Sequence, residues 1–115
     1  IRDRWIKGKS IAGPTGPYLV TKDEIVDINN LNLSLDVNGE RRQTGNTERM
    51  IFNFNFLVSH ISHFMTLYPG TIITTGTPAG TAMEMDMPKF LQVGDKLNLK
   101  VDHLGEQNHI VVKES

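Results

Sequence analysis

Strict alternation of apolar and polar residues over positions 31–37 constrains the fold of this chain more than any other feature. The apolar members are Leu31, Leu33, Leu35 and Val37. A period of two is typical of a half-buried β-strand. Asn38-Gly39 follows at once, and this dipeptide is the strongest short-range hairpin signal. We therefore predict a β-hairpin, with a short polar return strand over 40–43 and a loop over 44–47.

The second half of the chain repeats this pattern around one helix. Residues 97–101 alternate again, 103–106 read as a turn, and 109–112 complete a second hairpin. Between the hairpins, apolar residues recur at helical spacing, which predicts an amphipathic helix at about 54–66. These residues are Phe54, Leu57, Val58, Ile61, Phe64 and Met65.

These elements predict an α+β fold that is mostly β. Asn53 is the expected N-cap of the helix, and Pro69-Gly70 would stop the chain from continuing it. We expect the apolar face of the helix to pack on a sheet that includes residues 31–37 and a further strand at 71–75. A short strand at 18–21 is also possible.

Composition narrows the class of protein. The 115 residues suit one small domain, and a net charge of −1 gives no electrostatic case for nucleic acid or an anionic membrane as partner. No cysteine is present, and no apolar run approaches the length of a membrane span. The chain opens mid-pattern at Ile1 without a methionine, so we interpret it as a piece of a longer soluble protein.

The segment at 70–80 carries the clearest functional signal. A β-branched run ends abruptly in Gly-Thr-Pro-Ala-Gly, which supplies two glycines, a proline and exposed backbone donors. A strand that ends this way often brings its backbone close to a small polar ligand. A plain turn at the end of a strand is the alternative.

Other candidate side chains are ambiguous by themselves. His60 and His63 could bind a metal together, although we favour a solvated flank of the helix for both. The carboxylates of Glu84 and Asp86 are best explained as part of a surface loop. Lys9 stands in a Gly- and Pro-containing loop, where a partly desolvated lysine could bind a carboxylate or polarise a carbonyl. A solvated loop lysine remains the alternative.

Taken in order, several segments resemble the C-terminal part of the fumarylacetoacetate hydrolase family. The resemblance runs through nearly all of 1–115, and the chain would be the C-terminal part of a single catalytic domain. The segments are WIKGKS, GPTGPYLVTKDEI, LDVNGERRQTGNTERMIF, FMTLYPGTIITTGTPAG, FLQVGDKL and LGEQ. The bacterial branch that includes acylpyruvate hydrolases is the most similar in character.

The resemblance implies a family-specific mixed-sheet β-sandwich or roll and a cytoplasmic, homodimeric enzyme. Such enzymes bind Mg²⁺ or Mn²⁺ and hydrolyse a C–C bond in acylpyruvate-like or 2,4-dioxo acids. An isomerase or decarboxylase of hydroxymuconate-type diacids is the alternative reading. A non-catalytic structural fragment of the same fold is the third.

The resemblance assigns roles to four residues of this chain. Lys9 would be catalytic, beside the metal, and Arg2, Gly76 and Thr77 would bind the 2-oxo acid substrate. For Arg2, a solvated surface arginine is the plain alternative. The metal ligands of the family would lie upstream of Ile1, so this piece alone is expected to be inactive.

Two short spacings depart from the family pattern. Only Arg4 separates Asp3 from Trp5, and few residues separate Ser10 from Pro14. Either the protein truly lacks these residues, or loop segments are missing from the sequence at these two places. We favour the second explanation.

Overall fold

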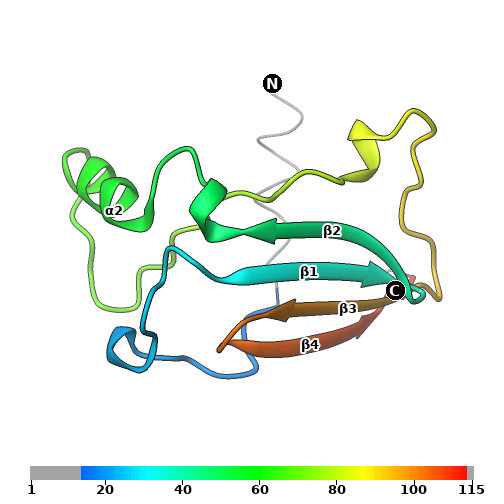
Figure 1. Cartoon of the computed structure of the whole chain (residues 1–115), viewed down its shortest axis with the longest axis horizontal. Helices are drawn as coiled ribbons and strands as arrows, with labels where there is room; N and C mark the ends of the chain where they lie inside the picture. Colours follow the sequence, from blue (N-terminus) through cyan, green and yellow to red (C-terminus); the bar gives the residue numbers. More distant parts are fainter. Residues whose placement is uncertain (1–13, 114–115) are drawn as a thin grey trace.

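The computed structural model describes residues 14–113, and its centre is one antiparallel sheet (Figure 1). The sheet has four strands in the order β2-β1-β3-β4. The regular elements in chain order are η1 (Lys22–Glu24), β1 (Asn32–Val37), β2 (Glu40–Asn46), η2 (Thr47–Arg49), α2 (Phe54–Ser62), η3 (Ala82–Glu84), β3 (Lys96–Val101) and β4 (Gly105–Ile110). This confirms the expected α+β, mostly β class.

Both predicted hairpins form, but the second differs in its bounds: β4 begins at Gly105, inside the expected turn at 103–106, and ends at Ile110, before the predicted end at 112. β1 and β2 are joined by Asn38 and Gly39, whose φ values of 53° and 81° are those of the turn that an Asn-Gly pair favours. The Asn38 side chain also accepts a hydrogen bond from the Lys96 backbone N–H at 2.9 Å. The first hairpin is therefore tied to the start of β3, which lies on the other side of β1.

The strand register gives the sheet one apolar face. Leu35 of β1 lies opposite Gln43 of β2 on one side and Leu99 of β3 on the other. Directly opposed residues point to the same face of a sheet. The face therefore collects the alternating apolar residues of the two central strands, Leu33, Leu35, Val37, Leu97, Leu99 and Val101.

A β-bulge interrupts this regular pattern in β2. Leu35 pairs with Gln43 while Asp36 pairs with Arg41, so Arg42 is an extra residue. β2 also continues to Asn46, beyond the predicted end at Gln43. The predicted loop at 44–47 is wrong over residues 44–46, because backbone pairing with β1 holds these polar residues in the strand.

The helix is shorter than predicted and does not lie on the sheet. Asn53 caps it as expected, accepting from the Phe56 N–H at 2.9 Å, but α2 ends at Ser62. Phe64 and Met65 remain exposed, so no burial favours further helical turns. Figure 1 shows α2 beside one end of the sheet, and the predicted packing of the helix across the sheet is therefore wrong.

Residues 71–75 and 18–21 form no strand, which corrects two further expectations. Ile72 is largely exposed, and the strands of the described residues pair only with one another. A β-branched run becomes a strand only where a neighbouring strand accepts its backbone.

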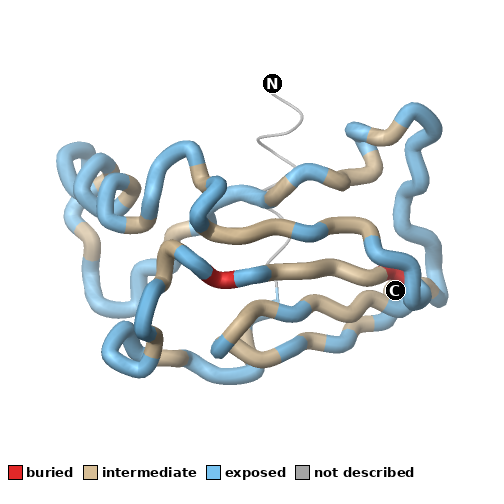
Figure 2. Tube along the Cα trace, in the orientation of Figure 1, coloured by how far each residue is buried: buried red, intermediate tan, exposed pale blue. Residues whose placement is uncertain are grey.

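Burial within the described part is sparse. Leu31 and Val37 are the only buried hydrophobic residues there (Figure 2). The single sheet is purely antiparallel, so the mixed-sheet sandwich stays a prediction. Across residues 14–113, no helix combines the length and the apolar character that crossing a bilayer requires.

Candidate functional site

The Gly-Thr-Pro-Ala-Gly loop, residues 76–80, is held against β2 by close backbone packing. A Cβ added at Gly45 would lie 2.9 Å from the Cβ of Pro78. A Cβ at Gly80 would lie 2.2 Å from the backbone oxygen of Arg42, and Gly80 also has a φ of +102°. Only glycine allows both approaches, so the two glycines let the loop dock on the strand.

One side-chain amide fastens the middle of this loop. Gln43 Nε2 donates to Thr77 Oγ1 at 2.9 Å and to the Pro78 carbonyl oxygen at 2.8 Å. Gln43 belongs to β2, whose backbone is paired along its length with β1. The position of Thr77 is therefore set by the sheet.

A capping box fixes the segment that follows the loop. The Glu84 carboxylate accepts from the Gly80 N–H at 2.7 Å and from the Thr81 N–H at 3.0 Å. The hydrogen bond from Thr81, followed by that from Gly80, lowers the pKa of Glu84 below its ordinary value. Glu84 is thus a structural acceptor, in line with the surface-loop interpretation of this acidic pair.

The loop presents free hydrogen-bond donors at Gly76 and Thr77. Both residues are exposed, and neither backbone N–H donates to an acceptor among residues 14–113. Gly76 has a φ of +95°, with open space where a Cβ would stand. The Thr77 hydroxyl already donates to the Pro78 carbonyl oxygen at 3.4 Å. The two adjacent N–H groups suit an anionic or carbonyl oxygen.

Lys9 and Arg2 lie outside the described residues. The structure therefore does not test whether Lys9 and Thr77 face a common cavity, and both assignments remain predictions.

The described residues contain no group of three side chains that could hold a metal ion. His60 stacks on Phe56, with ring centroids 5.7 Å apart, and meets Phe64 edge to face at 5.1 Å. His63 Nδ1 lies 2.6 Å from the Ser59 carbonyl oxygen. These contacts favour the helix-flank interpretation over a histidine pair on a metal. Residues 14–113 alone therefore do not supply a ligand set for a metal ion of the expected kind.

Sequence reasoning missed Gln43, Gly45 and Arg42. Gly45 carried a usable signal, because a glycine within a strand often marks close approach of another backbone. Placing Gly45 in a loop hid that signal. Gln43 offered none, because its two acceptors lie 34 and 35 positions further along the chain.

The chain matches a family model described as fumarylacetoacetate (FAA) hydrolase C-terminal over residues 2–112. It is also 44% identical to an uncharacterized protein of Staphylococcus aureus strain USA300. That match covers 97% of this chain but 38% of the relative, so the chain spans well under half the length of this relative.

Three solved structures are similar in fold and sequence. A fumarylacetoacetate hydrolase from Exiguobacterium antarcticum is 36% identical with a TM-score of 0.88, covering 94% of this chain and 39% of that one. A maleylpyruvate hydrolase from Sphingobium sp. SYK-6, in complex with manganese(II) and pyruvate, is 33% identical with a TM-score of 0.77, covering 87% and 35%. A 5-carboxymethyl-2-hydroxymuconate delta-isomerase from Mycobacterium smegmatis is 32% identical with a TM-score of 0.72, covering 86% and 36%.

Proposed function

Because the chain belongs to the fumarylacetoacetate hydrolase family, we propose that it is the C-terminal part of the single catalytic domain of a longer, metal-dependent hydrolase. This longer polypeptide is called the parent protein below. Its reaction is hydrolysis of a C–C bond in an acylpyruvate-like or 2,4-dioxo acid. The parent protein is cytoplasmic and homodimeric in this proposal.

One observation carries the choice of reaction. The similar maleylpyruvate hydrolase holds manganese(II) and pyruvate, and its match covers 87% of this chain. Pyruvate is the 2-oxo acid that hydrolysis of an acylpyruvate releases together with a carboxylic acid. A substrate with a 2-oxo carboxylate end is therefore the class to test first.

Residues 76–77 would bind the substrate. The free N–H groups of Gly76 and Thr77 would donate to a substrate oxygen, and Gln43 would keep Thr77 in place through its bond to Oγ1. Lys9 would add a positive charge near the developing enolate, and Arg2 would hold a carboxylate. A divalent cation, Mg²⁺ or Mn²⁺, would polarise the 2-oxo acid from ligands upstream of Ile1.

Chelation tests the metal dependence. The parent protein should lose acylpyruvate hydrolysis in excess EDTA and regain it with Mg²⁺ or Mn²⁺, measured as pyruvate release. The 115-residue piece by itself should release none. Pyruvate release that persists in EDTA would contradict the metal-dependent reaction.

Lys9→Met tests the proposed catalytic lysine. Removing its charge while keeping its bulk should lower kcat/KM by about 10²–10³-fold, the scale for one preorganised electrostatic partner. The free energy of unfolding should change by less than about 1 kcal/mol. Turnover close to that of the wild type would show that Lys9 is a solvated loop lysine with no catalytic role.

An isomerase or decarboxylase of hydroxymuconate-type diacids is the second candidate. The similar delta-isomerase favours it, at nearly the same identity as the hydrolase. Incubation of the parent protein with each substrate class, followed by NMR, separates the two. Double-bond migration or CO₂ loss without pyruvate would replace the hydrolase proposal, and no turnover of either class would favour a structural role.

A further inference from the structure

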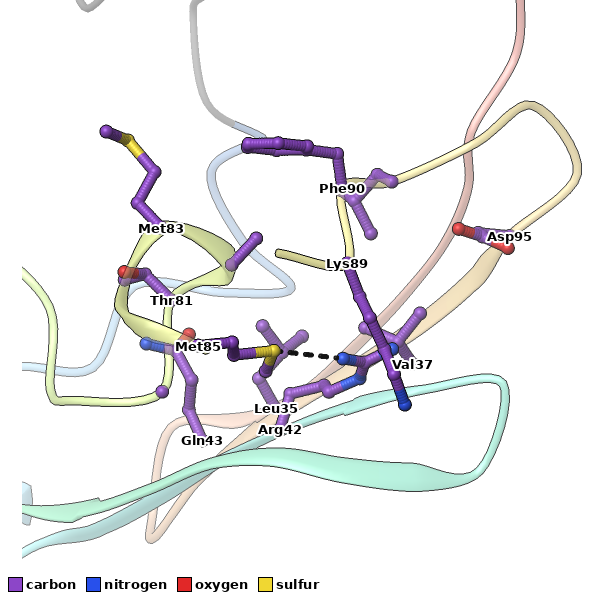
Figure 3. Close-up of a pocket in the computed structure, with 13 residues that line it drawn as sticks. Leu35, Val37, Arg42, Gln43, Thr81, Met83, Met85, Lys89, Phe90 and Asp95 are labelled. Atoms are coloured by element: carbon purple, nitrogen blue, oxygen red, sulfur yellow. Dashed lines mark hydrogen bonds between the residues drawn. The ribbon is translucent and has the colours of Figure 1, made fainter. Parts of the chain in front are cut away.

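An open apolar groove of about 530 Å³ lies between the sheet and the segment that follows the Gly-Thr-Pro-Ala-Gly loop. Its floor is formed by Leu35 and Val37 of β1. Its far wall is formed by side chains of the connecting segment that include Met83, Met85, Lys89 and Phe90, as the close-up in Figure 3 shows. The apolar side chains of this wall are Met83, Met85, Phe90 and Leu91.

The bulge in β2 turns a charged side chain into this groove. Arg42 is the extra residue of the bulge, and it lines the groove together with its neighbour Gln43. Strict alternation would send two successive side chains to opposite faces of the strand. The bulge therefore places a guanidinium beside the apolar floor.

Arg42 is incompletely satisfied there. Its side chain is 14% exposed, and its Nε is buried without a hydrogen-bond acceptor in the described part of the chain. Its other nitrogens meet weak or distant partners, with Met85 Sδ at 3.5 Å and Glu40 Oε2 at 3.7 Å. A buried donor of this kind calls for an acceptor oxygen.

The groove wall is as exposed as an outer surface. Met83 is 65% exposed and Phe90 64% exposed, although both line the groove. Contiguous exposed apolar residues beside a half-buried Leu35 and a buried Val37 are typical of a surface that another segment covers.

A polypeptide segment fits this groove better than a small anion does. Asp95 also lines the groove, and its carboxylate already accepts from Gln92 N–H and from Asn38 Nδ2. Lys89 is a second cation that lines the groove, and Glu40 lies 3.5 Å from it and 3.7 Å from Arg42. Asp95 and Glu40 together balance these two positive charges, so the groove offers an anion little net attraction. The surface is instead mainly apolar, with one unmet donor.

We propose that a segment of the parent protein outside this chain docks in the groove. It packs apolar side chains against Met83, Phe90 and Leu91 and brings an acceptor oxygen to Arg42. The Staphylococcus aureus relative supports this source, because about three-fifths of its length lies outside the region that matches this chain. The inference rests on the parent protein being longer, and it is independent of the proposed chemistry.

Two methionines of the same segment test the docking. Met83 lines the groove, whereas Met87 does not and is 80% exposed. In the intact parent protein treated with dilute H₂O₂, peptide mass spectrometry should show Met83 oxidised about tenfold more slowly than in the urea-unfolded protein. Met87 should react within about threefold of its unfolded rate. Met83 reacting as fast as in the unfolded protein would overturn the proposal.

Arg42 is tested against its neighbour Arg41, which pairs with Asp36 and does not line the groove. Arg42→Met should raise the Met83 oxidation rate several-fold in the parent protein, while Arg41→Met should leave it unchanged. An equal response of the two variants would remove Arg42 from the proposal.

Dilution and crosslinking identify the occupant. Protection of Met83 should not change across about a hundredfold dilution, because docking within one chain is independent of concentration. A photo-crosslinker at position 83 should join peptides that precede residue 1 in the same molecule. Protection lost on dilution, or crosslinks only between molecules, would assign the groove to a second copy and refute the docking within one chain. These outcomes do not depend on whether the parent protein hydrolyses acylpyruvates.

Discussion

The turn at Asn38 and Gly39 and the loop at 76–80 both contain glycines at positive φ, but different contacts hold them. Gly39 has a φ of +81° and open space around it, and the turn joins two strands that pair directly with each other. Gly80 has a φ of +102° and lies against the backbone of Arg42, 38 positions earlier. The conformation of the turn is specified locally, and the loop is held by a strand that is remote in sequence.

This difference determines how substitutions in the two segments affect the stability of the protein. A substitution at Gly39 strains only the backbone of the turn, because a Cβ added there would meet no atom within 4 Å. A change in the loop disturbs its own backbone, its contact with β2 and the position of Thr77 together. The following predictions test this contrast in the parent protein.

Gly80→Ala should have the largest effect. The positive φ and the collision with the Arg42 oxygen should together lower the free energy of unfolding by about 3 kcal/mol, measured by urea denaturation. Gly76→Ala has similar φ but open space, so it is the matched control and should cost roughly 1 kcal/mol. Equal losses for the two variants would show that the contact with β2 contributes nothing.

Gly39→Ala should have a smaller effect. Only left-handed backbone strain is added, which costs about 1–2 kcal/mol. Gly39→Asn should be milder, because asparagine adopts positive φ more readily than alanine. Both variants should keep kcat/KM unchanged, since the turn lies away from residues 76–77 in the sequence and in Figure 1. A large loss of activity in either variant would show that the Asn38-Gly39 turn also affects the proposed substrate site.

Gln43→Met should cost about 1 kcal/mol of stability, because two hydrogen bonds are lost and water can reach the exposed Thr77 oxygen. Amide hydrogen exchange should accelerate in residues 76–80. The exposed neighbour provides the control, since Thr44→Val should leave exchange in the loop unchanged. An unaltered loop in Gln43→Met would mean that Gly45 and Gly80 suffice to dock it.

The smallest effect concerns pH. The folded-state pKa of Glu84 is lowered, so the stability from its carboxylate is present above its unfolded pKa of about 4.3. That contribution is lost as pH falls through the lowered folded-state pKa. Urea midpoints of wild type and Glu84→Gln should therefore differ at pH 6 and converge in acid. A difference that persists unchanged to pH 2 would remove the carboxylate as its source.

The amino-acid sequence determined the hairpins of this protein. Alternation over 31–37, the Asn-Gly pair and the second alternating run predict strands and turns that the structure contains, because their hydrogen bonds form between neighbours in the chain. The Asn53 cap was equally predictable, since its acceptor and donor are three residues apart.

Only the tertiary structure decided the fate of the run at 71–75, the end of α2 and the docking of the loop at 76–80. The run at 71–75 has strand propensity but no neighbouring strand within residues 14–113. α2 stops early because Phe64 and Met65, the next apolar residues, remain exposed. The docking of residues 76–80 depends on contacts that Gln43, Gly45 and Gly80 make. No local pattern encodes these contacts, because each joins residues more than 30 positions apart whose meeting follows from how the sheet is assembled.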